Sequence, residues 1–167
     1  MGLRLMKKIA DELEKHPIND DYFDLSVTYI EADDITDIIW AIIKAYGGGN
    51  TFFVDCGSLF WDYQSEPVMV FKDFDSSIPL EDMLSILSYF PMFSTRSGEV
   101  ESCAEKVFVV SDIPLLDQYP DYGRDGELSF WSSFMYCIHN VMICKNNTVK
   151  SYSLDDYLEE NGIRLED

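Results

Sequence analysis

Apolar residues recur at helical spacing in four stretches of the chain, each with a recognisable beginning or end. The first stretch stops at the His16-Pro17 pair, because the residue before a proline is pushed away from helical backbone angles. The second begins behind an aspartate that can cap a helix and stops at three glycines. In the last, Ser153 and Asp156 have the spacing of a capping box. The predicted helices cover residues 3–15, 34–46, 79–90 and 154–161.

Shorter stretches alternate apolar and polar residues or form brief apolar runs, and these patterns predict strands. The Asn146-Asn147 pair predicts the tight turn of a hairpin within residues 139–152. The aromatic segment 128–138 is ambiguous between strand and helix, and we interpret it as a strand. The other predicted strands cover residues 25–31, 51–55, 67–71 and 106–110.

These elements predict an α+β fold. The 167 residues fit a single domain, and 47% of them are apolar, which is enough to form a substantial core. We expect one domain over residues 1–167, with a largely antiparallel sheet and about four helices packed on it.

Two segments, residues 68–84 and 141–158, resemble each other. Each begins with Val-Met, has a lysine shortly afterwards, and ends with Leu-acid-Asp-x-Leu at the start of a predicted helix. A duplicated unit explains the match, and so does the independent recurrence of strand, turn and capped helix. Both explanations stay open at the level of sequence.

The charge of the chain is strongly negative. There are 31 acidic residues against 12 basic ones, which gives a formal net charge of −19. Residues 1–15 carry a small basic excess, so the acids gather in the remainder. A field of this sign repels nucleic acid and anionic lipid and speeds encounter with basic proteins. We therefore expect no direct nucleic-acid binding and no membrane binding, and we favour a basic protein as the partner.

The chain shows no pattern typical of export or membrane insertion. No apolar run approaches the ~18 residues of a membrane-spanning helix. The first fifteen residues carry charges where a signal peptide needs an apolar stretch. The four cysteines have irregular spacing, which does not indicate a set of disulfides. In a reducing compartment, such cysteines are most simply explained as buried apolar side chains. We expect a cytoplasmic protein.

Catalytic patterns are sparse. Cys137 and His139 are two residues apart, but no third group that would orient the pair is evident. Four aspartates near predicted strand ends offer an acid/base or Mg²⁺ site, although such groups also arise by chance in so acidic a chain. We expect no enzyme activity, no catalytic residue, no metal and no cofactor. The four aspartates are Asp55, Asp62, Asp73 and Asp75.

Two segments combine aromatic and acidic residues in the way that suits contact with a basic protein, because tyrosine and tryptophan are favoured as buried anchors of interfaces. One is the long loop 112–127, whose length itself suggests a function. The other is the turn-rich segment 57–67. The candidate partner-binding residues are Asp117, Tyr119, Asp121, Tyr122, Asp125, Glu127, Trp61, Asp62 and Glu66.

The run "GGGNTFFVD" (Gly47 to Asp55), followed by the strand "PVMVF" and the capped helix "SIPLEDML", resembles bacterial toxin-immunity proteins of the SUKH type over residues 47–84. The resemblance implies a small, acidic, cytoplasmic protein of bacteria, of the kind found in contact-dependent growth inhibition. Such a protein binds a cognate basic toxin, often a nuclease, in a one-to-one complex and blocks its active site.

Two other functions remain open. A nucleic-acid mimic, such as a phage anti-restriction or anti-CRISPR protein, would space its acids like phosphates along an elongated face. A small hydrolase would use Asp55, Asp62 or the Cys137/His139 pair.

Overall fold

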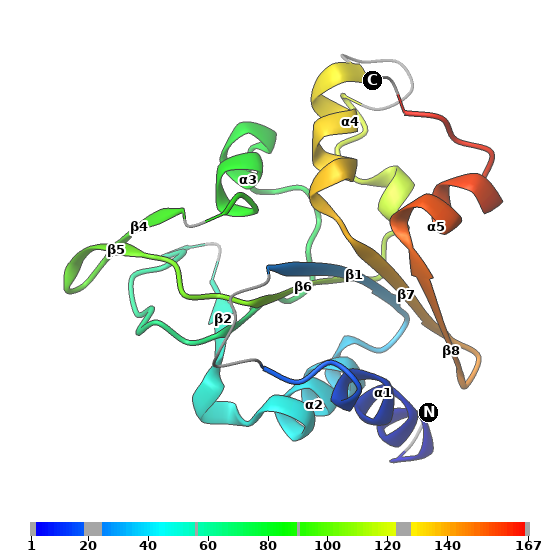
Figure 1. Ribbon diagram of the computed structural model, residues 1–167, viewed down its shortest axis with the longest axis horizontal. Helices are drawn as coiled ribbons and strands as arrows, with labels where there is room; N and C mark the ends of the chain where they lie inside the picture. Colours follow the sequence, from blue (N-terminus) through cyan, green and yellow to red (C-terminus); the bar gives the residue numbers. More distant parts are fainter. Residues whose placement is uncertain (1–2, 19–24, 56, 90, 123–127, 166–167) are drawn as a thin grey trace.

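The computed structural model describes residues 3–18, 25–55, 57–89, 91–122 and 128–165. In these ranges, a six-stranded sheet runs through the middle of the molecule and helices cover both of its faces (Figure 1). The expected mixture of helices and strands in one domain is confirmed.

Five of the six strands are parallel. The strand order is β2-β3-β6-β1-β7-β8, and only β8 runs antiparallel to its neighbour. The prediction of a largely antiparallel sheet is therefore wrong. The strands are β1 (Ser26–Ala32), β2 (Thr51–Val54), β3 (Val68–Phe71), β6 (Lys106–Ser111), β7 (Asn140–Lys145) and β8 (Thr148–Ser153).

The helices form two layers. In Figure 1, α1 and α2 lie below the sheet, whereas α3, α4 and α5 lie above it. No helix in the described ranges has both the length and the apolar character needed to cross a membrane. The five α-helices are α1 (Leu3–Glu14), α2 (Ile35–Tyr46), α3 (Leu80–Ile86), α4 (Leu128–Cys137) and α5 (Leu154–Glu160), with 3-10 turns η1 (Gly48–Asn50) and η2 (Leu115–Asp117).

The central strand β1 shows why the sheet is parallel. Val27 and Tyr29 belong to the core beneath α3, α4 and α5, whereas Ile30 belongs to the core beneath α1 and α2. All three side chains are fully buried. A strand that is buried on both faces is typical of parallel sheets, because helical crossovers cover each face.

The segment 128–138 accounts for one crossover that was not predicted from the sequence. It forms α4 instead of the predicted strand, and its buried side chains Trp131, Phe134, Met135 and Ile138 recur at helical spacing. As a helix, it provides the crossover between β6 and β7, two parallel strands that lie on either side of β1.

The predicted helix ends are confirmed where local chemistry determines them. The Asp34 side chain accepts hydrogen bonds from the backbone N–H groups of Thr36 and Asp37, at 3.0 and 3.4 Å. Gly47 has a φ of 90° and its N–H donates to the Ile43 carbonyl at the other end of α2. These are the capping interactions expected of aspartate and glycine.

A small hairpin, β4 (Met92–Thr95) and β5 (Gly98–Glu101), was not predicted. It projects beside the main sheet (Figure 1). Its Phe93 ring stacks on Phe60 with a centroid distance of 3.7 Å, and this contact helps to hold the hairpin against the segment after β2. Helix α3 ends at Ile86, earlier than the predicted Phe90.

The two similar segments differ in structure. Residues 68–84 form β3 and the beginning of α3, whereas residues 141–158 form a complete hairpin, β7 and β8, before α5. The predicted turn at Asn146-Asn147 is confirmed, since both residues have positive φ. The two segments therefore share a first strand and a later helix, whereas the second strand and the side-chain cap occur only in residues 141–158. Whether they arose by duplication stays a prediction.

Candidate functional site

Acidic residues gather where the parallel strands end. The carboxyl ends of parallel strands lie along the same edge of a sheet, and in open α/β sheets this edge is the usual place for a binding site. We call the following set the acidic edge: Glu31, Asp33 and Asp34 at the end of β1, Asp55 after β2, Asp73 and Asp75 after β3, and Asp112 and Asp117 after β6.

Part of the acidic edge surrounds a hollow of about 740 Å³. The four aspartates that the sequence places near strand ends all line it. We call this space the acidic hollow, and the four aspartates that line it are Asp55, Asp62, Asp73 and Asp75. Lys72 also lines the hollow, but its Nζ lies over the Phe53 ring, 6.0 Å from the centroid. Among the described residues it forms no ion pair.

Local hydrogen bonds hold the aspartates of the hollow in place. Asp55 Oδ1 accepts from the Gly57 N–H at 2.8 Å, and Asp75 Oδ1 accepts from the Ser77 N–H at 3.2 Å. Asp73 has a φ of 56°, in the left-handed region that aspartate tolerates better than most residues. The turn chemistry of aspartate thus builds the loops after β2 and β3 and presents carboxylates at the same time.

The fourth aspartate of the hollow, Asp62, belongs to a surface cluster that also contains the exposed Trp61. Arg96, from the β4–β5 turn, donates from Nη2 to Asp62 Oδ1 at 2.8 Å. The same guanidinium lies 5.7 Å from the Trp61 ring, and Trp61 is 46% exposed. Trp61 and Asp62 therefore lie on the surface beside the hollow. Glu66 is half-buried, and its Oε1 accepts from the Gln64 N–H at 2.6 Å.

The loop after β6 is only partly available to a partner. Asp117 and Asp121 are exposed, and Tyr122 is half-buried, with its ring against Phe130. Tyr119, in contrast, is 4% exposed and donates from its hydroxyl to the Ile78 carbonyl at 2.6 Å. The prediction that Tyr119 is a surface anchor is wrong, because its ring packs in the core below α4. The predicted residues Asp125 and Glu127 lie outside the described residues.

A buried amide fixes this loop to the sheet. Gln118 is 1% exposed, and its Nε2 lies within hydrogen-bonding distance of the Tyr29 hydroxyl, the Ser111 hydroxyl and the Phe74 carbonyl. Its Oε1 accepts from the Ser76 hydroxyl at 2.5 Å. Burial raises the pKa of Tyr29 far above its ordinary value, so the phenol remains protonated. The network joins the ends of three strands to the acidic loop.

The middle of the acidic edge contains one strong ion pair. Glu31 is 7% exposed, and its Oε2 lies 2.6 Å from Lys145 Nζ, which is also 4.0 Å from Asp33. The hydrogen bond with Glu31 raises the pKa of Lys145. The pair compensates a nearly buried carboxylate, so Glu31 contributes to stability, and the net attraction for cations comes from the other acids of the edge.

The described side chains offer little for the hydrolase alternative. Burial raises the pKa of the Cys137 thiol, which disfavours the thiolate. His139 Nδ1 accepts a hydrogen bond from the Val27 N–H at 2.9 Å, so this nitrogen already has a proton donor. No three His, Cys, Asp or Glu side chains in the described part of the chain are arranged to hold a metal ion. The four carboxylates that line the acidic hollow make its local charge negative.

Two features of the site had no signal in the sequence. Arg96 lies in the hairpin that was not predicted, and its contact with Trp61 and Asp62 depends on the fold. The charge compensation of Glu31 by Lys145 depends on the pairing of β1 with β7. No protein-family model matches the chain, and no curated protein matches it in sequence.

Proposed function

We propose that this protein is an immunity-type inhibitor that binds a basic bacterial toxin domain in a one-to-one complex and blocks its active site or substrate surface. The observation that carries the proposal is the acidic hollow, in which four aspartates surround one space at the carboxyl end of the sheet. A nuclease toxin presents lysine and arginine side chains to the phosphates of its substrate. Those side chains would occupy the hollow in place of phosphate.

The surroundings of the hollow support a tight complex as well as a fast one. A net charge of −19 steers a cationic protein toward the surface and accelerates association. Trp61 lies beside the hollow with nearly half of its surface exposed, and tryptophan is favoured among residues that dominate binding energy. Asp117 belongs to the same acidic edge, and the predicted residues Asp121 and Tyr122 follow it in the chain. In this proposal the protein acts in the cytoplasm, without enzyme activity or a cofactor, and contacts neither nucleic acid nor membrane.

Affinity capture from lysate of the native host, followed by mass spectrometry, tests the proposal when two variants are compared. In the first, Asp55→Asn, Asp73→Asn and Asp75→Asn neutralise the hollow while keeping the side-chain oxygen that forms the local turns. The second, Glu14→Gln, Glu159→Gln and Glu160→Gln, removes the same charge from exposed helix positions. The captured protein is then purified and assayed for toxicity and for inhibition by the wild-type chain.

We expect a basic protein that the wild-type chain and the helix variant retain, that the hollow variant loses, and whose toxic activity the wild-type chain inhibits. Equal retention by the wild-type chain and both variants would contradict the role of the hollow. Retention of several unrelated DNA-binding proteins, each displaced by DNA, would support the nucleic-acid mimic instead.

A further inference from the structure

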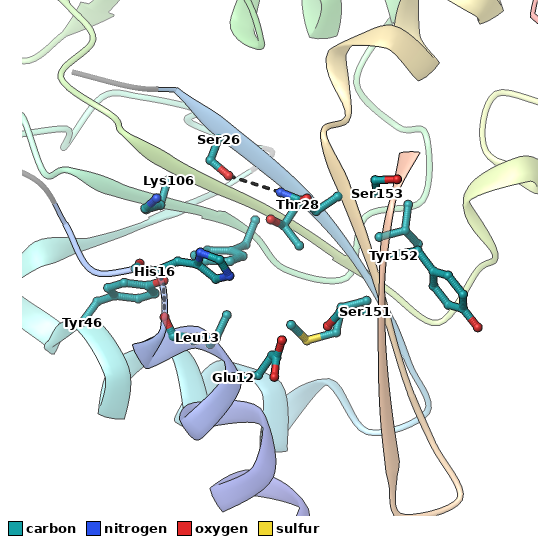
Figure 2. A pocket seen from close by; sticks show the side chains of 14 residues that line it. Glu12, Leu13, His16, Ser26, Thr28, Tyr46, Lys106, Ser151, Tyr152 and Ser153 are labelled. Carbon is teal, nitrogen blue, oxygen red and sulfur yellow. Dashed lines mark hydrogen bonds between the residues drawn. The ribbon is translucent and has the colours of Figure 1, made fainter. Parts of the chain in front are cut away.

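A second pocket, of about 240 Å³, lies at the opposite end of the sheet, between the strands and helices α1 and α2 (Figure 2). Its floor is built by the beginning of three parallel strands and the end of β8. Ser26 of β1 pairs with Lys106 of β6, and Thr28 of β1 pairs with Asn140 of β7. Asn140 in turn pairs with Ser153 of β8. Polar side chains thus lie in register across the sheet.

This polar patch is unusual because it lies on the face that α1 and α2 cover. Farther along the same strands, that face is apolar: Ile30, Val110 and Cys144 belong to the buried core. Between the two regions, Phe108 and Met142 line the pocket and are also buried core residues. The pocket therefore has an apolar inner part and a polar outer part, which is the usual composition of a small-molecule site.

The walls of the pocket are fixed by the helices. Leu13 and His16, at the end of α1, form one wall, and Tyr46, at the end of α2, forms another (Figure 2). The buried Tyr46 hydroxyl lies 3.2 Å from the Leu13 carbonyl and 3.0 Å from the His16 carbonyl. The wall is therefore preformed, which lowers the cost of binding.

Lys106 gives the pocket its charge. It is half-buried, and with the residues that the structure describes it forms no ion pair. Glu12 also lines the pocket, but its Oε2 lies 2.9 Å from Lys15 Nζ, so its charge is compensated. Among the residues that the structure describes, the pocket thus contains one lysine, Lys106, that has no acidic partner.

We infer that this pocket binds a small organic carboxylate with an apolar body. The Lys106 ammonium would hold the carboxylate in a charge-assisted hydrogen bond, and the neighbouring hydroxyls of Ser26 and Thr28 would donate to it. Leu13, Phe108 and Met142 would contact the apolar body. The volume is below the ~300–1,000 Å³ of pockets for drug-sized ligands, so one ring or a short aliphatic chain fits.

Titration of the isotope-labelled full chain with benzoate and hexanoate, followed by NMR, tests the inference. Benzamide and hexanamide are the matched neutral probes. We expect saturable shifts of the amide signals of Thr28 and Phe108 with the two carboxylates, and at least about tenfold weaker binding of the two amides. Added salt should weaken the binding of the carboxylates alone.

Two variants test whether the Lys106 ammonium supplies the charge that binds the carboxylate. Lys106→Met should weaken carboxylate binding by about tenfold or more, whereas Lys150→Met, which removes an exposed lysine from β8 outside the pocket, should leave it unchanged. Should Lys106→Met fail to fold, Thr28→Val in the pocket provides a second test and should also weaken binding. Equal binding of acids and amides, no binding, or binding unaffected by the pocket variants would overturn the inference. None of these outcomes depends on the toxin partner.

Discussion

The two ends of the same sheet differ in chemistry. The carboxyl end presents the acidic hollow, with four aspartates and one lysine that lies over a phenylalanine ring. The amino end has Lys106 among serine, threonine and asparagine side chains. A parallel sheet makes this separation possible, because all carboxyl ends lie on one side and all amino ends on the other. One small sheet can therefore present opposite charges to two kinds of ligand.

The largest expected effect is on the attachment of the acidic loop. Gln118→Ala removes a buried amide and leaves the Tyr29 and Ser76 hydroxyls short of a partner. Because unsatisfied buried polar groups are costly, we expect the free energy of unfolding to fall by about 2–4 kcal/mol. Urea unfolding measures the change, with the exposed Gln64→Ala as control. A loss equal to that of the control would show that the network does not hold the loop.

The next effect concerns the ion pair in the middle of the acidic edge. Lys145→Met leaves the nearly buried Glu31 carboxylate without its ion-pair partner. We therefore expect the free energy of unfolding to fall by about 1–3 kcal/mol at neutral pH. The pKa of Lys145 is raised above 10.5 in the folded state. Its contribution is therefore complete below pH 10.5 and is lost as the pH rises through the folded value. Thermal unfolding of the wild-type chain and the variant at several pH values measures the difference in their stability. We expect this difference to become smaller at alkaline pH. A difference that stays constant would contradict the assignment.

At the amino end, Tyr46→Phe tests whether the pocket wall is held by the phenol. Loss of the contacts with the Leu13 and His16 carbonyls should cost about 1 kcal/mol. Burial raises the pKa of Tyr46 to about 12. The neutral phenol therefore stabilises the fold fully below pH 10, and this stabilisation declines as the pH rises toward 12. Chemical unfolding at several pH values measures both effects, and no decline relative to the variant would refute the second.

The smallest effect is a gain in stability. Neutralising the hollow with Asp55→Asn, Asp73→Asn and Asp75→Asn relieves repulsion among like charges, so we expect a gain of about 0.5 kcal/mol at low salt. Because salt screens such repulsion, the gain should vanish at high ionic strength. Thermal unfolding with and without salt measures it. A loss of stability would mean that these carboxylates are held by interactions that asparagine cannot replace.

Much of the fold could be predicted where local chemistry determines it. The caps at Asp34 and Ser153 and the turn at Asn146-Asn147 each follow from the preferences of single residues. Helix α4 could not be assigned with certainty, because its aromatic residues are equally common in strands. That ambiguity hid the crossover between β6 and β7, whereas the predicted helices 34–46 and 79–90 already lay between strands that prove to be parallel.

The candidate site was predictable to a similar extent. The aspartates of the acidic hollow lie near predicted strand ends, but their meeting at one edge depends on parallel strands, which were not predicted from the sequence. The burial of Tyr119 could not be predicted, since it depends on α4 covering the loop. The pocket at Lys106 could not be predicted from the sequence either. It requires the register of four strands that are distant in the sequence.

The position of β1 has a consequence for how the chain emerges from the ribosome. This strand is made early, but its two neighbours in the sheet are residues 106–111 and 140–145. Until β7 has been translated, one edge of β1 presents unpaired backbone N–H and C=O groups, which can pair with other nascent chains. Synthesis that stalls before residue 140 should therefore yield fragments that aggregate or are degraded.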